Sequence, residues 1–215
     1  MLAVPVLAGC VRAQLTMGIS SDDKASGLLV LASPQGVKPP TVTVPDTLSS
    51  AVKIDPYQQG GFTGSQVTFT NLGFAQVQTL TSSLTSDGKG TYAIDLRRSG
   101  DIVTLDGTVD LTNAPPGSGA EVSVSISFPA QVSTTNGAKQ EDNTITWSTN
   151  GDAKNMQLGR NNLLQATVGY ADPSRRSFTQ WTLLLGGATL GVALLVVLLA
   201  LLTRDRSARP GRVRR

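Results

Sequence analysis

An uncharged apolar run at residues 181–202 restricts the possible folds of this chain more than any other sequence feature. As a helix its 22 residues would be roughly 33 Å long, which matches the roughly 30 Å hydrocarbon core of a bilayer. Transmembrane helices carry glycine more freely than soluble ones, and Trp181 stands where an interfacial aromatic is expected. The alternative, a buried helix of a soluble protein, would need to be wrapped on every side. The run therefore predicts one transmembrane helix.

The charges that flank this run predict its orientation. Six arginines follow it within residues 203–215, whereas Arg175 and Arg176 precede it. Short arginine-rich segments remain in the cytoplasm during insertion, so the larger group of arginines determines the orientation of the helix. We expect residues 203–215 to be a basic cytoplasmic tail and residues 11–176 to be an extracytoplasmic domain. The tail suits anionic inner-leaflet lipids, but we interpret it as a topology signal.

The net charge of the whole chain hides an acidic exported part. The chain has 18 Lys+Arg and 15 Asp+Glu, or +3. Residues 204–215 hold six Arg and one Asp, which leaves 12 basic and 14 acidic residues in the remainder, or −2. This balance gives no indication of nucleic-acid binding, and no nucleic-acid partner is expected.

The only cysteine stands near the start, in the sequence Leu7-Ala8-Gly9-Cys10. This pattern has the form of a bacterial lipobox, whose thiol receives a diacylglyceryl group before cleavage. A single thiol in an exported protein cannot form an internal disulfide, so lipidation at Cys10 explains it better than a free thiol. The weaker alternative is that residues 1–10 are a hydrophobic first strand.

A complete signal peptide has a basic segment and a longer apolar core than these positions provide. Only nine residues precede Cys10, and none is basic. Residues 1–10 are therefore expected to be a truncated lipoprotein signal peptide that ends in the lipobox cysteine. With an acyl anchor at Cys10 and a helix at 181–202, both ends of the domain would be attached to the plasma membrane.

Alternation of apolar and polar side chains predicts strands in the second half of the domain. In residues 121–128, valine, isoleucine and phenylalanine alternate with serine. Residues 91–98 and 102–111 flank a Ser-Gly pair, which predicts a hairpin. An Asn-Gly pair at 136–137 indicates a second hairpin between residues 131–135 and 144–148, and residues 163–170 are expected to form a last strand.

The first half mixes strands with two short helices. A polar turn separates residues 14–19 from 25–32 and predicts an opening hairpin, and residues 66–70 indicate a further strand. Asp46 is expected to cap a helix at 47–53, and a second helix is expected at 74–84. We therefore expect an α+β domain with a mainly antiparallel sheet and two short helices against one face.

Nearly the whole chain resembles the LppM lipoproteins of mycobacteria and related actinobacteria. The segments that carry this resemblance are the lipobox at 7–10, Met17-Gly18-Ile19-Ser20, Asp22-Asp23, Ser26-Gly27, Asp95-Leu96-Arg97-Arg98 with Gly100, residues 105–112, Phe128-Pro129, Thr135-Asn136-Gly137 and residues 172–178. The resemblance implies a lipid-binding type of fold, with a cavity between sheet and helices, that associates with phosphatidylinositol-mannoside glycolipids.

If such a cavity exists, large apolar side chains near the expected sheet and helices would form its wall. These candidates are Phe62, Phe69, Phe74, Val77, Leu80, Leu96, Val124 and Ile126. The alternative is that they fill an ordinary core, because apolar alternation reports burial and not the ligand. Arg97 and Arg98 at the hairpin tip could bind a lipid phosphate, since guanidinium groups fit phosphate oxygens, although a solvated turn explains them better.

Little in the sequence supports catalysis. The chain has no histidine, and Cys10 is expected to carry lipid, so common nucleophile–base pairs and histidine metal sites are excluded. Residues 60–65 lack the spacing of a phosphate-binding loop and indicate a turn before a strand. No cofactor, metal or catalytic residue is expected.

Two functions of different classes remain. The first is a non-enzymatic module that binds or senses envelope lipids or glycolipids at the outer face of the plasma membrane. The alternative is a structural or regulatory subunit that docks onto a membrane enzyme, an unidentified protein partner, without a ligand of its own.

Overall fold

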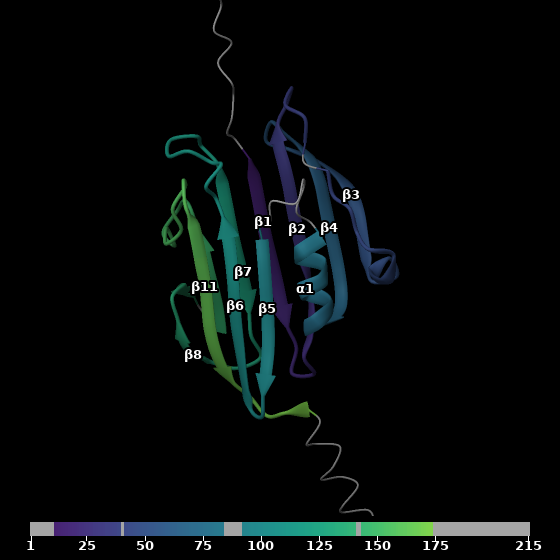
Figure 1. The fold of residues 1–215 in the computed structure, drawn as a ribbon, viewed down its shortest axis with the longest axis vertical. Coiled ribbons are helices and arrows are strands. Elements are labelled where there is room, and N and C mark those ends of the chain that lie inside the picture. Colours follow the sequence, from purple (N-terminus) through teal and green to yellow (C-terminus); the bar gives the residue numbers. More distant parts are fainter. Residues whose placement is uncertain (1–10, 40, 84–91, 141–142, 174–215) are drawn as a thin grey trace, which may run out of the picture. The chain divides into compact units, whose positions relative to one another are not determined.

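The computed structural model describes residues 11–39, 41–83, 92–140 and 143–173. The chain divides into a unit that ends at Ala171 and a second one that begins at Asp172. Only two residues of the second unit are described, so the architecture below is that of the first. Its described residues form two β-sheets packed face to face and one α-helix (Figure 1).

The larger sheet has the strand order β3-β4-β2-β1-β7-β10-β9. Its strands are β1 (Arg12–Ile19), β2 (Lys24–Pro34), β3 (Val52–Gln59), β4 (Phe62–Gly73), β7 (Glu121–Ser127), β9 (Ala138–Lys139) and β10 (Thr144–Ser148). Neighbouring strands are antiparallel except β1 and β7, which run parallel. The opening hairpin and the strand around residues 66–70 are confirmed.

The smaller sheet is antiparallel throughout, with the order β5-β6-β11-β8. Its strands are β5 (Tyr92–Ser99), β6 (Ile102–Asp110), β8 (Val132–Thr135) and β11 (Asn161–Gly169). Alternate side chains of β6 and β11 are buried, which places their apolar residues between the two sheets. The hairpin around Ser99 and Gly100 and the last strand are confirmed.

The helix α1 (Phe74–Ser83) follows β4 directly and lies beside β5, over β2 and β4 of the larger sheet (Figure 1). It buries only Val77, Leu80 and Thr81. The Thr81 hydroxyl accepts a hydrogen bond from the Ile94 N–H at 3.3 Å, and so connects the helix to the edge of the smaller sheet. The helix thus covers a strand edge that would otherwise be open.

A single apolar core lies between the two sheets and under α1. It contains Trp147, Met17, Ile126, Ile145, Leu105 and Leu164, each at most 1 % exposed. Residues of both sheets belong to the same cluster, so the layers depend on each other for burial.

The helix predicted at residues 47–53 is wrong. Only Asp46–Leu48 form a 3₁₀ turn, η1; its N-cap position is Pro45 and not Asp46, and it has no side-chain capping bond. Val52–Gln59 form the edge strand β3, which pairs with β4 along its full length. Pairing along this edge prevails over the local helical signal, and Pro56 is tolerated because an edge strand has N–H groups that need no partner.

The hairpin predicted around Asn136 and Gly137 is also wrong. β8 pairs with β11 in the smaller sheet, whereas β9 pairs with β10 in the larger sheet. The Asn-Gly pair therefore lies where the chain crosses between layers. By contrast, Gly60 and Gly61 form the predicted turn, with positive φ angles of 59° and 78°, and β4 begins directly after them.

Within the described ranges, no helix has the length and apolar character needed to cross a membrane. The predicted transmembrane run at 181–202, the tail at 203–215 and Cys10 all lie outside the described residues.

Candidate functional site

The predicted cavity residues divide into two groups. Leu96, Val124 and Ile126 fill the core between the sheets, at 4 %, 0 % and 0 % exposure. Phe69, Val77 and Leu80 line a small enclosed cavity between α1 and the larger sheet, together with Leu15, Met17, Leu29, Thr81 and Tyr92. Its volume is about 10 Å³, close to the smallest space that holds one water molecule.

The two remaining phenylalanines lie at the margin of the core. Phe74 begins α1 and packs against the core while partly exposed. Phe62 begins β4, and the Arg12 guanidinium lies 4.1 Å from its ring centroid. The same Arg12 pairs with Glu121 at 2.8 Å. Phe62 therefore belongs to a surface cluster near the start of β1 and not to the cavity.

Tyr92, one of the residues that line the cavity, has a buried hydroxyl group. Its side chain is 4 % exposed, and its hydroxyl has no hydrogen-bond partner among the described residues. Burial raises the pKa of the phenol above its ordinary value of 10.0. A buried hydroxyl without a partner costs about 1–3 kcal/mol, so the group calls for an explanation.

Replacement of Tyr92 by phenylalanine should leave the free energy of unfolding of the ligand-free domain unchanged or raise it by about 1 kcal/mol, because it removes a hydroxyl without a partner. Because burial raises the pKa of Tyr92 only in the folded state, the phenol ionises in the unfolded chain first, and the domain loses stability as the pH rises above 10 toward the folded-state pKa. Urea denaturation should therefore show a smaller alkaline loss in the variant. Equal losses above pH 10 would contradict this explanation.

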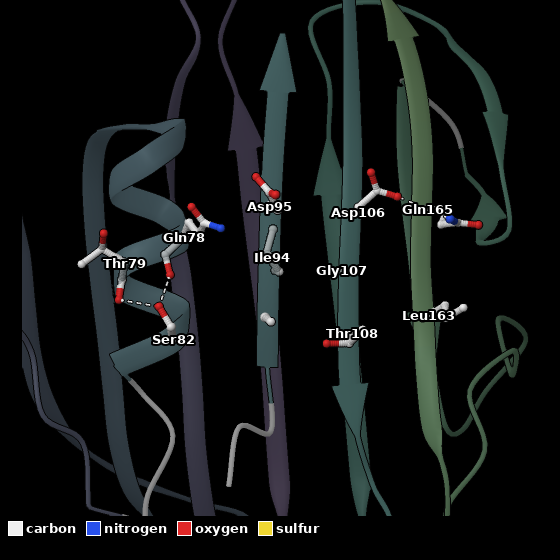
Figure 2. A pocket seen from close by; sticks show the side chains of 11 residues that line it. Gln78, Thr79, Ser82, Ile94, Asp95, Asp106, Gly107, Thr108, Leu163 and Gln165 are labelled. Atoms are coloured by element: carbon white, nitrogen blue, oxygen red, sulfur yellow. Dashed lines mark hydrogen bonds between the residues drawn. The ribbon is translucent and has the colours of Figure 1, made fainter. Parts of the chain in front are cut away.

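A larger groove lies on the other side of α1, over the outer face of the smaller sheet. Figure 2 shows Gln78, Thr79 and Ser82 of the helix at one side and the strand side chains across from them. The strand residues that line it are Ala93, Ile94, Asp95, Asp106, Gly107, Thr108, Leu163 and Gln165. Its volume is about 420 Å³, in the usual range for ligand pockets.

A second groove of about 390 Å³ begins where the first ends. Both include Asp106 and Gln165, and the Gln165 amide donates a hydrogen bond to the Asp106 carboxylate at 3.4 Å (Figure 2). Hydroxyl side chains of Thr104, Thr134, Thr135 and Thr167 line the second groove. These residues are not predictable from the sequence, because they come from strands whose neighbours only the tertiary fold defines.

The two arginines of the predicted phosphate site have different environments. Arg97 is 73 % exposed and pairs with Asp95 of the same strand. Arg98 is 12 % exposed and forms a bidentate ion pair with Asp23, in which Nε lies 2.5 Å from Oδ2 and Nη2 lies 2.6 Å from Oδ1. Its guanidinium also lies 4.3 Å from the Tyr170 ring centroid. Arg98 is therefore engaged in an internal contact, and Arg97 alone extends into solvent.

No group of three or more metal-ligating side chains occurs in the part of the chain that the structure describes. Asp23, in the turn between β1 and β2, pairs with Arg98. Asp110 accepts hydrogen bonds from the Thr112 N–H at 2.9 Å and from its hydroxyl at 2.7 Å, and these bonds lower the pKa of the Asp110 carboxyl. Cys10, the predicted lipidation site, lies outside the described residues.

In its described residues the geometry thus defines a mostly β-sheet α+β domain with one α-helix, an apolar cavity on the inner side of that helix and an open groove of mixed polarity on the other. The model of the LppM domain matches residues 12–170. The chain belongs to the LppM family.

Two comparisons agree with this assignment. The chain is 34 % identical over 212 residues to the protein LppM of Mycobacterium tuberculosis, and the match covers 97 % of this chain and 89 % of that protein. The NMR structure of the folded domain of M. tuberculosis LppM matches with a TM-score of 0.64 and 30 % identity, over 81 % of this chain and 98 % of that one.

Proposed function

We propose that this chain is an envelope lipoprotein whose exported domain binds or senses envelope lipids or glycolipids, of the phosphatidylinositol-mannoside type, at the outer face of the plasma membrane. The lipobox at Cys10 and membership of the LppM family support the anchoring. We further propose that binding involves no catalytic step.

The observation that carries the proposal is the apolar cavity between α1 and the larger sheet, which Tyr92 helps to line, together with the buried Tyr92 hydroxyl, which has no hydrogen-bond partner among the described residues. Aliphatic side chains suit an acyl chain, and the phenol can donate a hydrogen bond to an ester carbonyl. A lipid that brings both groups would remove the unfavourable desolvation of Tyr92.

Entry of an acyl chain requires α1 to move away from β2 and β4, because the cavity in its present form holds about one water molecule. The helix buries only two apolar side chains, Val77 and Leu80, whose exposure costs about 3–6 kcal/mol. Burial of each acyl methylene contributes about 0.8 kcal/mol, so about eight methylenes offset this cost. A lipid of ordinary chain length can therefore open the site.

Native mass spectrometry of residues 11–173, incubated with envelope lipids, tests the proposal. The separate domain is a suitable sample because the corresponding M. tuberculosis domain was solved as a folded domain. We expect persistent lipid adducts on the wild type and at least a several-fold lower bound fraction on Tyr92→Phe.

Tyr57→Phe is the matched control, since the Tyr57 hydroxyl bonds Gln59 at 3.2 Å outside the cavity. It should retain wild-type adducts. A wild-type protein free of lipid, together with a crosslinked membrane protein in cells, would refute lipid binding and support the docking subunit instead.

A further inference from the structure

We propose that the open groove between α1 and the outer face of the smaller sheet binds an uncharged polyhydroxylated group, such as the glycan part of an amphiphile. The inference deepens the proposed function and relies on it for the lipid part of the ligand. The groove is formed by strands β5, β6 and β11 and by the side of the helix that carries Gln78, Thr79 and Ser82.

The side chains around the groove supply both kinds of hydrogen-bonding group that a sugar needs. Gln78 and Gln165 carry amide donors and acceptors, and Thr79 and Thr108 carry hydroxyls. Asp106 presents carboxylate oxygens, which accept hydrogen bonds from hydroxyls. Leu163 is 60 % exposed at one margin and offers an apolar surface for the C–H face of a ring.

The charge of the groove selects against anions. Asp95 and Asp106 contribute two carboxylates, and none of the described residues that line the groove is cationic. Arg97, the nearest basic residue in the sequence, is paired with Asp95, so the carboxylate of Asp106 supplies the unbalanced negative charge of the groove. A phosphate would therefore meet like charge, whereas a neutral hydroxylated group meets complementary donors and acceptors.

Small residues create the space. Ala93 of β5 is an exposed position opposite Thr108 in the ladder, and its methyl group leaves the groove open. The second groove adds about 390 Å³ across the Asp106–Gln165 bond and extends the same surface with hydroxyl side chains. The surface can therefore hold successive sugar units.

The two sides of the helix face different environments. Val77, Leu80 and Thr81 line the apolar cavity, whereas Gln78, Thr79 and Ser82 line the groove, where polar and apolar groups are mixed. One amphiphile could place its acyl chain on one side of α1 and its sugars on the other. This arrangement assigns the two parts of the ligand to two separate sites.

NMR titration of residues 11–173 with methyl α-mannoside, maltose and trehalose tests the groove. We expect shifts of the amide signals of Thr79, Asp95, Thr108 and Gln165 with at least one of these sugars. Ala93→Trp fills the groove from a position outside the core and should weaken that affinity about tenfold or more. Thr16→Trp, an exposed strand position on the other sheet, should leave it unchanged.

Titrations with inorganic phosphate and with ethanolamine complete the test. Shifts at the groove with either ion but with none of the sugars would overturn the inference, as would the absence of all shifts or equal affinity of Ala93→Trp. The outcome is separate from that of the lipid experiment, because acyl adducts that depend on Tyr92 can persist when no sugar binds.

Discussion

Replacement of Trp147 by alanine should lower the free energy of unfolding by about 3–5 kcal/mol, the range for a fully buried aromatic. Trp147 is 1 % exposed in β10 and belongs to the core shared by both sheets. Its indole N–H donates to the Asn136 side-chain oxygen at 2.8 Å. The same oxygen accepts from the Gln165 N–H at 2.8 Å, and the Asn136 amide donates to the Leu163 carbonyl at 2.9 Å. Trp147 and Asn136 therefore connect the two sheets.

Urea denaturation of the isolated domain measures this loss, and Trp147→Phe separates its two parts. Phenylalanine retains much of the apolar volume but lacks the N–H donor, so its loss should be about 1–2 kcal/mol. A Trp147→Ala domain of nearly wild-type stability would refute the role of this residue in joining the layers.

Arg98→Ala should lower the free energy of unfolding by about 3 kcal/mol, because it leaves the Asp23 carboxylate without its main partner in a partly buried position. Further contacts hold Asp23 in position for its ion pair with Arg98. Asp23 has a positive φ of 58° in the β1–β2 turn, and its carboxylate also accepts a hydrogen bond from the Tyr170 hydroxyl at 2.8 Å. The contact thus joins three separate segments of the chain.

Arg97→Ala is the matched control, since Arg97 is 73 % exposed and its surface ion pair with Asp95 contributes at most about 1 kcal/mol. The double variant Arg98→Ala/Asp23→Ala should recover part of the loss, because it removes the unpaired carboxylate. Equal losses for Arg97→Ala and Arg98→Ala in urea denaturation would contradict the assignment.

Strands were predictable where one face is buried, because alternation reports burial directly. Residues 102–111 and 121–128 show this pattern, and both form strands of the core. The helix predicted at residues 47–53 is wrong because the pairing of β3 with β4 is a tertiary effect, which the local sequence does not show. The hairpin predicted at the Asn-Gly pair 136–137 is wrong. The Asn136 side chain accepts hydrogen bonds from Trp147 in the larger sheet and from Gln165 in the smaller sheet, so this segment connects the two sheets.

The sites were less predictable than the fold. Apolar residues such as Phe69 and Leu80 were identified, but the sequence could not separate cavity wall from packed core. Tyr92 was missed because a missing hydrogen-bond partner is visible only in three dimensions. The groove residues were missed because Asp106 and Gln165 are 59 positions apart in the sequence.

The chain enters the sandwich at the start of β1 and leaves it after β11, at the opposite end of the strands (Figure 1). The contact of Tyr170 with Asp23 fixes the exit beside the far turn of β1, which is about 26 Å from its start for eight residues. A force that pulls the two ends apart is therefore directed along the strands and perpendicular to their hydrogen bonds. Many bonds of β1 must then break together, so the domain should resist mechanical extension better than one that opens strand by strand.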